Sequence, residues 1–194
     1  MTVAYVKDGE RGYLRVGVAD GDKKFVFSIS QKEYREIGEV RPRDKISEEQ
    51  LEFLTRCDEL YKASLRALRI LSYGDNSKRM LAKKLYSAGV RRDIIDEVVE
   101  QMLSLGYINE ERQISRLVLN EVTLRFYGPR KIIPKLISKG YDKSEIEAVI
   151  STLVREGEVD FSVSREKLLA AKLSEDAGEE EKNNLLYKYG YNTY

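Results

Sequence analysis

Charged groups are the most numerous side chains of this sequence that can do chemistry. Its 194 residues include 34 Lys and Arg and 33 Asp and Glu, but no His and a single cysteine, Cys57. A Ser-His-Asp triad, a Cys-His pair and a disulfide within the chain are therefore excluded. Phosphate-binding motifs of the GxxxxGK(S/T) or GxGxxG type are also absent. We expect a protein that is not an enzyme and that uses no cofactor and no metal.

The charges occur in blocks of alternating sign instead of being mixed along the chain. Residues 62–92 contain nine basic side chains and one acidic one, and residues 125–143 contain six basic and one acidic. The segments 93–121 and 144–181 are acidic, with seven and eleven carboxylates against two and four basic residues. Two interpretations remain open. Helices of opposite charge can pair with one another, or basic helices can face a polyanion or an acidic partner.

The first thirty residues have the pattern of a β-hairpin. Residues 13–19 and 24–29 are rich in β-branched and aromatic side chains, and Asp20-Gly21-Asp22 lies between them. Because glycine accepts the positive φ that such a turn needs, we predict two antiparallel strands there. Residues 2–6 can add a third strand, and Ser30 is placed to cap a short helix over residues 31–37.

The rest of the chain has a helical pattern that repeats after 51 residues. Beyond a long helix predicted over residues 48–71, two helices end at Gly89 and Gly106, and the shift places these glycines on Gly140 and Gly157. A period near fifty is typical of tandem structural units that bury their apolar faces on one another. Apolar residues that coincide under the same shift include the pairs Leu81 and Ile132, Leu85 and Leu136, and Ile95 and Ile146.

These patterns predict a mainly α fold of tandem three-helix bundles, built of winged-helix or helix-turn-helix-like units, with an N-terminal β-hairpin. We expect the hairpin and a short helix in residues 1–45 and a first repeat in residues 46–109. A second repeat should follow in residues 110–160, and an incomplete third in residues 161–194.

The third repeat is expected to stop early. Gly190 lies fifty residues after Gly140, and residues 191–194 are too few for another helix. Whether the natural chain ends there stays open. We also expect a loop between Leu173 and Glu181, and Pro134 is a candidate for a bend inside its helix.

Basic side chains on two helices one repeat apart are the candidate functional residues. Leu81 and Leu85 should point inward, which leaves the basic side chains of the same helix in solvent. The second copy carries a comparable helix, so the two would form a stripe that suits an extended, repetitive partner and makes salt-sensitive contacts. The residues expected to make these contacts are Lys78, Arg79, Lys83, Lys84, Arg91, Arg92, Arg130, Lys131 and Lys135.

Two other groups of residues have simpler structural explanations. Asp93, Asp96, Glu97 and Glu100 share one face of a predicted helix and can in principle hold a hard cation. Carboxylates are favoured near a helix start, however, so we expect a solvated face. Cys57 is expected to be a small apolar residue of a helix.

Tyrosines near the predicted helix ends allow two interpretations. We favour packing of each ring on the apolar seam, with the hydroxyl group in water. The alternative is stacking on the bases of single-stranded nucleic acid. The tyrosines concerned are Tyr73, Tyr86, Tyr107, Tyr127 and Tyr141.

The order of these elements resembles the RecX family. The resemblance is carried by residues 77–85 (SKRMLAKKL) followed by Gly89, by residues 105–112 (LGYINEER), and by residues 128–130 (GPR) with Gly140 in the second copy. It covers essentially the whole chain, and its specificity lies in the joint order and the period of about fifty residues. Residues 113–115 depart from the aromatic-alanine pair that the family usually has after this turn.

This resemblance implies tandem three-helix repeats that regulate the RecA recombinase in DNA repair and the SOS response. The implied partner is the RecA filament on single-stranded DNA, whose strand exchange and ATP turnover would be limited. We expect a cytoplasmic monomer that does not enter a membrane. A module that binds DNA directly and a helical scaffold for an unrelated protein partner remain the alternatives.

Overall fold

The structure, a computed structural model, describes residues 1–192; Thr193 and Tyr194, the end of the short segment after Gly190, lie outside the described residues. The chain divides into two compact units. The first contains residues 1–73 and 84–101, and the second contains residues 74–83 and the chain from residue 102 onward. The division passes through α3 (Lys78–Ser87) and α4 (Arg92–Ser104).

The first unit begins with an antiparallel sheet in the order β1-β2-β3. The strands are β1 (Thr2–Asp8), β2 (Leu14–Asp20) and β3 (Lys23–Ile29), and a short 3-10 helix (Glu10–Gly12) joins the first two. The predicted hairpin is therefore extended by the third strand that the sequence allowed. Its turn contains Gly21 at a φ of 58°, the conformation that favours glycine there.

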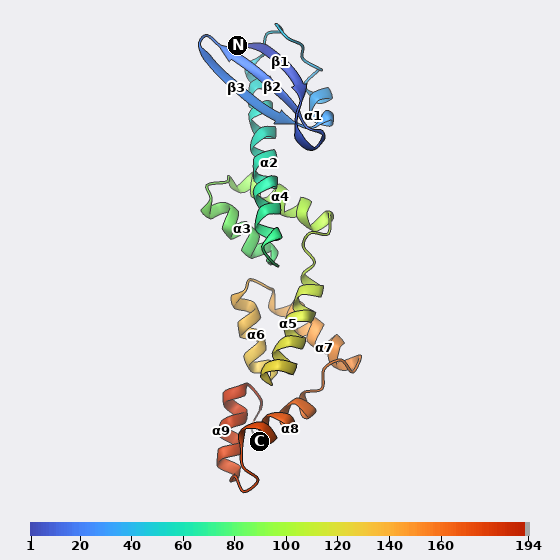
Figure 1. Cartoon of the computed structure of the whole chain (residues 1–194), viewed down its shortest axis with the longest axis vertical. Coiled ribbons are helices and arrows are strands. Elements are labelled where there is room, and N and C mark those ends of the chain that lie inside the picture. The colour runs from blue at the N-terminus through green and yellow to red at the C-terminus, as the bar shows by residue number, and fades with distance from the viewer. Residues whose placement is uncertain (193–194) are drawn as a thin grey trace. The chain divides into compact units, whose positions relative to one another are not determined.

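The strands are followed in the chain by the short helix α1 (Gln31–Glu36) and the long helix α2 (Glu48–Ser72). One face of the sheet packs on α2 (Figure 1). Both helices begin with a capping box, at Ser30 and at Ser47, as expected for these cap residues. Their side chains bury a single apolar core together with alternate residues of the strands. Its members include Val16, Val18, Phe27, Ile29, Leu54 and Cys57.

The second unit contains a three-helix bundle of α5 (Glu110–Arg125), α6 (Pro129–Ser138) and α7 (Lys143–Arg155) (Figure 1). Its core contains Ile132, Leu136 and Ile146, which are at most 1 % exposed. Helix α6 continues through Pro134, so the proline does not end it.

Two further helices follow the bundle, α8 (Phe161–Lys172) and α9 (Glu179–Tyr189). They share a smaller apolar cluster built on Leu168, Leu186 and Tyr191. The loop expected near residues 173–181 is shorter than predicted, because the acidic residues 179–181 already form the first turn of α9.

The predicted repeat is confirmed in the backbone. Helices α6 and α7 begin and end 51 residues after α3 and α4. Each second helix closes in the same way: the N–H of Val90 donates to Leu85, that of Tyr141 to Leu136, and that of Tyr191 to Leu186. The glycine before each donor has a φ between 81° and 90°. The structure is thus mainly helical, with tandem three-helix units after a small sheet. No helix within residues 1–192 combines the length and apolar character needed to cross a membrane.

Candidate functional site

Three helices of the second unit follow one another end to end: α9, α6 and the first half of α3. We call this arrangement the helix column. At one junction the backbone N–H of Gly128, which precedes α6, donates to the carbonyl of Tyr189 at the end of α9. At the other, the Ser77 hydroxyl, which precedes α3, donates to the carbonyl of Lys139 at the end of α6, at 2.9 Å. Ser77 and Gly128 hold equivalent positions in the repeat, and so do Lys139 and Tyr189. The same two positions therefore meet at both junctions.

Glycines allow the helix ends to come this close. A Cβ atom on Gly128 would lie 2.4 Å from the carbonyl oxygen of Gly190, and one on Gly140 would lie 2.6 Å from Ser77 Oγ. Gly140 and Gly190 also have φ values of 90° and 87°, which disfavour other residues. The contact with the neighbouring helix alone thus requires glycine at residue 128, whereas at residues 140 and 190 the left-handed backbone requires it as well.

The helix column brings the predicted basic residues of α3 and α6 onto one structure. Arg79 and Arg130 are 51 residues apart, and each lies in the first turn of its helix, beside a junction. The side chains of Arg79, Lys83 and Arg130 are exposed. Within residues 1–192, the side chains of Arg79 and Lys83 form no hydrogen bond or ion pair. These two side chains are the ones best placed to contact a partner.

Lys78 is instead held inside the second unit. Its Nζ lies 2.9 Å from Glu110 and 3.0 Å from Glu145, and its backbone N–H donates to Glu110 Oε1 at 2.8 Å. Hydrogen bonds to Glu110 first, and then to Glu145, raise the pKa of the Lys78 ammonium group. The structure therefore gives this lysine a role in joining α3 to α5 and α7.

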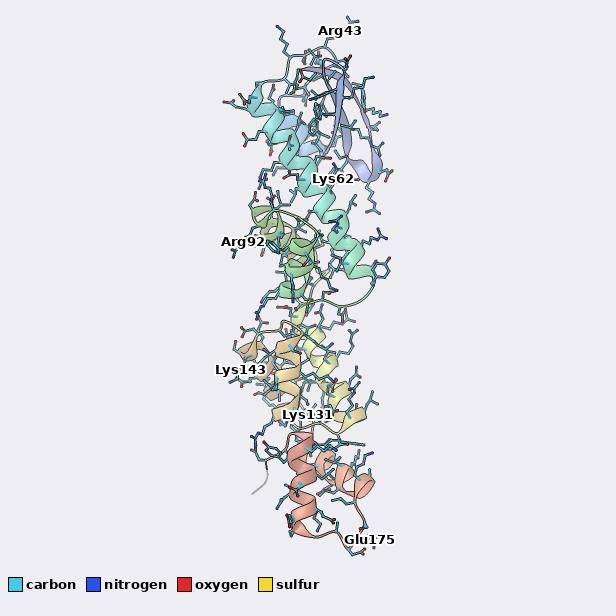
Figure 2. All side chains as sticks on the ribbon, turned by 90° about the vertical axis from the view of Figure 1, so that its left-hand side faces the viewer. Arg43, Lys62, Arg92, Lys131, Lys143 and Glu175 are labelled. Atoms are coloured by element: carbon cyan, nitrogen blue, oxygen red, sulfur yellow. The ribbon has the colours of Figure 1, made fainter. Side chains whose placement is uncertain are left out.

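Lys135 and Lys131 also have partners within the second unit. Lys135 Nζ lies 2.7 Å from both carboxylate oxygens of Glu121, which is buried. Lys131 lies over the rings of Tyr127 and Tyr189, at 4.2 and 5.3 Å from their centroids, and donates to the carbonyl of Lys188. Figure 2 shows Lys131 at the end of α6 that meets α9. Lys135 thus joins α6 to α5, whereas Lys131 stabilises the junction with α9, partly through cation–π contacts.

Arg130 combines exposure with an aromatic contact. Its guanidinium group lies 5.6 Å from the ring centroid of Tyr187, a residue of α9 that is 66 % exposed. The prediction did not include this tyrosine. Its signal in the sequence is the repeat itself, since Tyr86 occupies the equivalent place at the end of α3 and is also exposed.

The remaining predicted residues lie in the first unit. Arg91 forms ion pairs with Asp93 at 2.7 Å and with Glu59 at 3.4 Å, whereas Lys84 and Arg92 are exposed. The hydrogen bond to Asp93 is the main reason that the pKa of Arg91 is raised.

The expected packing of the tyrosines is correct for only part of the set. Tyr73 and Tyr86 are 81 % and 71 % exposed, so their rings do not lie on an apolar seam. Tyr141 is buried, and its hydroxyl donates to Gln113 instead of reaching water. The sequence pattern places these residues near helix ends but does not say which side of the helix they occupy.

The other candidate sites take part in ordinary structural contacts. Glu97 pairs with Arg56 and Asp93 with Arg91, and no group of three metal-ligating side chains occurs within residues 1–192. Burial is the main cause that raises the pKa of the Cys57 thiol to about 12, which keeps it protonated at neutral pH. The charged surface of the helix column is therefore the best candidate for function.

Comparisons with known proteins find RecX proteins as relatives of this chain. Residues 63–102 match the family model described as the first three-helix domain of RecX. The chain is 28 % identical over 187 residues to the regulatory protein RecX of Clostridioides difficile (strain 630), which covers 96 % of this chain and 84 % of that protein. It is 24 % identical over 157 residues to the regulatory protein RecX of Clostridium botulinum (strain Eklund 17B / Type B), with coverage of 80 % and 73 %.

Solved structures show the same fold. A crystal structure of regulatory protein RecX superposes with a TM-score of 0.72 at 17 % identity, over 100 % of this chain and 96 % of the other. A second, RecX from Lactobacillus salivarius, gives a TM-score of 0.58 at 24 % identity, over 71 % and 90 % of the two chains. At these identities the structures establish a similarity of fold.

Proposed function

Since the chain belongs to the RecX family, we propose that it is a non-enzymatic regulator that binds the RecA filament on single-stranded DNA and limits strand exchange and ATP turnover. The relatives carry the description regulatory protein, which gives the coarse role. The target and the direction of the effect are our inference. The protein acts in the cytoplasm, in DNA repair, and occupies a surface that the recombinase needs.

The observation that supports this function best is the helix column. It sets Arg79 and Arg130 beside two equivalent junctions, 51 residues apart, with exposed guanidinium groups. A row of charges with a structural period suits a partner that is itself periodic. Several weak contacts along such a partner add through effective concentration, so no single tight pocket is required.

The candidate residues divide into two groups in this proposal. Arg79, Lys83 and Arg130 are exposed on the second unit, and Lys84 and Arg92 are exposed on the first. We assign to each of them a contact with the filament. Lys78, Lys131, Lys135 and Arg91 already hold carboxylates or aromatic rings of the chain itself, and they act by fixing the helices. We also keep the division into residues 1–45, 46–109, 110–160 and 161–194 as our proposal for the repeat boundaries.

The test is a titration of the chain into RecA on single-stranded DNA, with ATP turnover measured at low and at high salt. We expect turnover to fall as the chain is added, with a smaller effect at high salt because exposed charge contacts are screened. Unchanged turnover at saturating concentrations would contradict the proposal.

Direct DNA binding is the second candidate function, and the exposed rings of Tyr86 and Tyr187 favour it. They occupy equivalent positions of α3 and α9, and Tyr187 stacks with Arg130. Exposed aromatic rings beside cations are suited to stacking with single-stranded bases. Tight, salt-sensitive binding to bare DNA without RecA would favour this function over the first.

A further inference from the structure

The helix column has an open end at the start of α9. Gly178 precedes α9 as Gly128 precedes α6, and glycine is needed at residue 128 because the end of another helix lies against it. At Gly178 no atom lies within 4 Å of the place that a Cβ would take. Figure 2 shows Glu175 in the loop before α9, at the end of that helix away from Lys131. Within residues 1–192, the start of α9 is thus one half of a junction, with no helix end packed against it.

The first unit carries the other half of such a junction. Gly89 ends α3 with a φ of 81°, as Gly140 and Gly190 end α6 and α9, but no atom lies within 4 Å of its Cβ position. A pocket of about 450 Å³ lies beside it, between α2 and the segment 89–94. We call it the Gly89 pocket.

The equivalent region of the second unit, between α5 and the end of α6, shows which kind of segment binds at such a place. In the second unit, residues 74–78, which lead into α3, lie against α5 and the end of α6. Glu110 accepts the backbone N–H of Lys78, and Arg116 pairs with Asp75. The equivalent of Glu110, 51 residues earlier, is Glu59, which lines the Gly89 pocket. Glu59 is thus the counterpart of a residue that holds the start of a helix.

The carboxylate of Glu59 has an oxygen atom that can accept a hydrogen bond from such a helix start. Its Oε2 atom is buried and, within residues 1–192, accepts no hydrogen bond, although the Arg91 guanidinium lies 3.4 Å away. A buried carboxylate oxygen without a hydrogen bond is costly, so an incoming N–H donor would be favourable. The carbonyl of Ala88, equivalent to those of Lys139 and Tyr189, accepts its hydrogen bond from the flexible side chain of Arg66 instead of from another helix.

The charges of the two open ends are complementary. The Gly89 pocket is lined by Lys62, Arg66 and Arg91, whereas the only carboxylate among its lining residues is Glu59. The open end of α9 carries the exposed acidic residues 175–176 and 179–181. At the inner junction the incoming end is basic, with Lys78 against Glu110 and Glu145. At the open ends the incoming end is acidic, and three of the four charged residues that line the pocket are basic.

In place of the monomer expected from the sequence, we propose that copies of this chain associate head to tail at high concentration, with the acidic start of α9 from one copy seated in the Gly89 pocket of the next. The contact repeats the two inner junctions, so Gly178 meets Gly89 as Gly128 meets Gly190. Because the two surfaces are different, the association is heterologous and can continue as an open chain of copies. The proposal does not rest on the RecA role, and its test contains no RecA.

The first experiment is sedimentation velocity of the full chain over a wide range of concentrations, at low and high salt. We expect growing species at high concentration and low salt. Gly178→Leu should abolish the growth, because the leucine side chain would occupy the space that the end of α3 from the next copy takes in the proposed contact. The φ of −67° at Gly178 accepts leucine, so the monomer should fold. Asn184→Leu, exposed on the same helix, is the matched control and should associate normally.

A pair of substitutions at one pocket residue changes the affinity in opposite directions. Leu65 is equivalent to Arg116, whose partner Asp75 lies two residues before the N-cap of α3. Asp176 lies two residues before Gly178, so Leu65→Arg should recreate this ion pair between copies. We expect the association to tighten about two- to fivefold, as for an exposed pair. Leu65→Glu should weaken it, and loss of the leucine is common to both variants.

Mixing the two variants tests the direction of assembly. Gly178→Leu retains a native pocket and Leu65→Glu retains a native α9 end. At a concentration at which each variant alone is monomeric, their mixture should form a one-to-one pair. Circular dichroism confirms folding, and if Gly178→Leu fails to fold, the Leu65 pair still decides. Three outcomes would overturn the proposal: a monomer at every concentration, association equal in Gly178→Leu and the native chain, or equal effects of Leu65→Arg and Leu65→Glu.

Discussion

Lys78 and Glu110 are joined twice. The backbone N–H of Lys78 donates to Glu110 Oε1 at 2.8 Å, and its side-chain Nζ lies 2.9 Å from Oε2 of the same carboxylate. Glu110 is only 9 % exposed. One buried carboxylate therefore caps the start of α3 and neutralises a lysine that the sequence predicts to face a partner.

Removing this carboxylate should destabilise the second unit. In Glu110→Ala the N–H of Lys78 and its ammonium group lose their shared acceptor, so we expect the free energy of unfolding to fall by about 1–3 kcal/mol. Denaturant unfolding followed by circular dichroism measures the change. Glu111→Ala removes an exposed neighbour in the same first turn and should stay within about 0.5 kcal/mol. Equal effects of the two variants would contradict the double contact.

The contribution of Lys78 should disappear in alkaline solution. Its pKa is raised in the folded protein, first by the hydrogen bond to Glu110, above the unfolded value of about 10.4. The stabilisation is therefore complete below that pH and is lost as the pH rises through the folded pKa. We expect Lys78→Met to be less stable than the native chain at pH 8, with the difference narrowing above about pH 10.4. Tyrosines titrate in both proteins and cancel in the comparison; a constant difference would be the contrary result.

Two glycines in equivalent positions should respond differently to the same change. Gly128→Ala places a Cβ 2.4 Å from the carbonyl oxygen of Gly190, so the end of α9 must move away, at a cost of about 1–3 kcal/mol. Gly178→Ala meets open space and should cost only the N-cap preference for glycine over alanine, about 0.5–1 kcal/mol. Gly128→Ala incurs the same N-cap cost, so the difference between the two variants reports the contact with Gly190. Thermal unfolding of both variants measures this. Similar losses in both would argue against a close junction at Gly128.

Charge reversal on α3 should weaken filament binding without affecting stability. Arg79→Glu with Lys83→Glu changes two exposed residues that form no ion pair within residues 1–192. We expect the affinity for RecA filaments to fall about tenfold, because each lost contact is an exposed charge pair. Lys24→Glu, exposed on β3, is the control and should bind normally if the sheet lies outside the interface. Unchanged binding of the double variant would remove α3 from the proposed surface.

Cys57 should be unreactive in the folded protein. Burial is the main cause that raises its pKa to about 12, so the thiolate that reacts with thiol reagents is scarce at pH 8. A chromogenic disulfide reagent should react slowly with the native chain and rapidly after unfolding in denaturant. Fast reaction of the native chain would show that the core around α2 opens readily.

Much of the fold follows from local signals in the sequence. Ser30 and Ser47 begin helices as capping boxes, and Gly89, Gly106, Gly140 and Gly157 end them with positive φ. These features depend on neighbouring residues only, so they can be predicted without tertiary information. One offset of 51 also relates Gly89 to Gly140 and Gly106 to Gly157.

The candidate site was predictable only in outline. The basic character of α3 and α6 is visible in the sequence, but Lys78, Lys131 and Lys135 gain partners from helices up to 67 residues away. Pairing of this kind depends on how the helices meet, which a linear charge pattern does not contain. Tyr187 was missed for the same reason, since its contact with Arg130 exists only after α9 is seated on α6.

The seated ends of the helix column have a consequence for how the molecule melts. A helix of ten residues such as α6 is marginal in water when isolated, and its terminal turns would normally open first. Here both of its termini share hydrogen bonds with a neighbouring helix, through Gly128 and Tyr189 at one end and Ser77 and Lys139 at the other. Fraying at either terminus therefore also breaks a hydrogen bond to the adjoining helix, so we expect the thermal opening of these helices to be coupled.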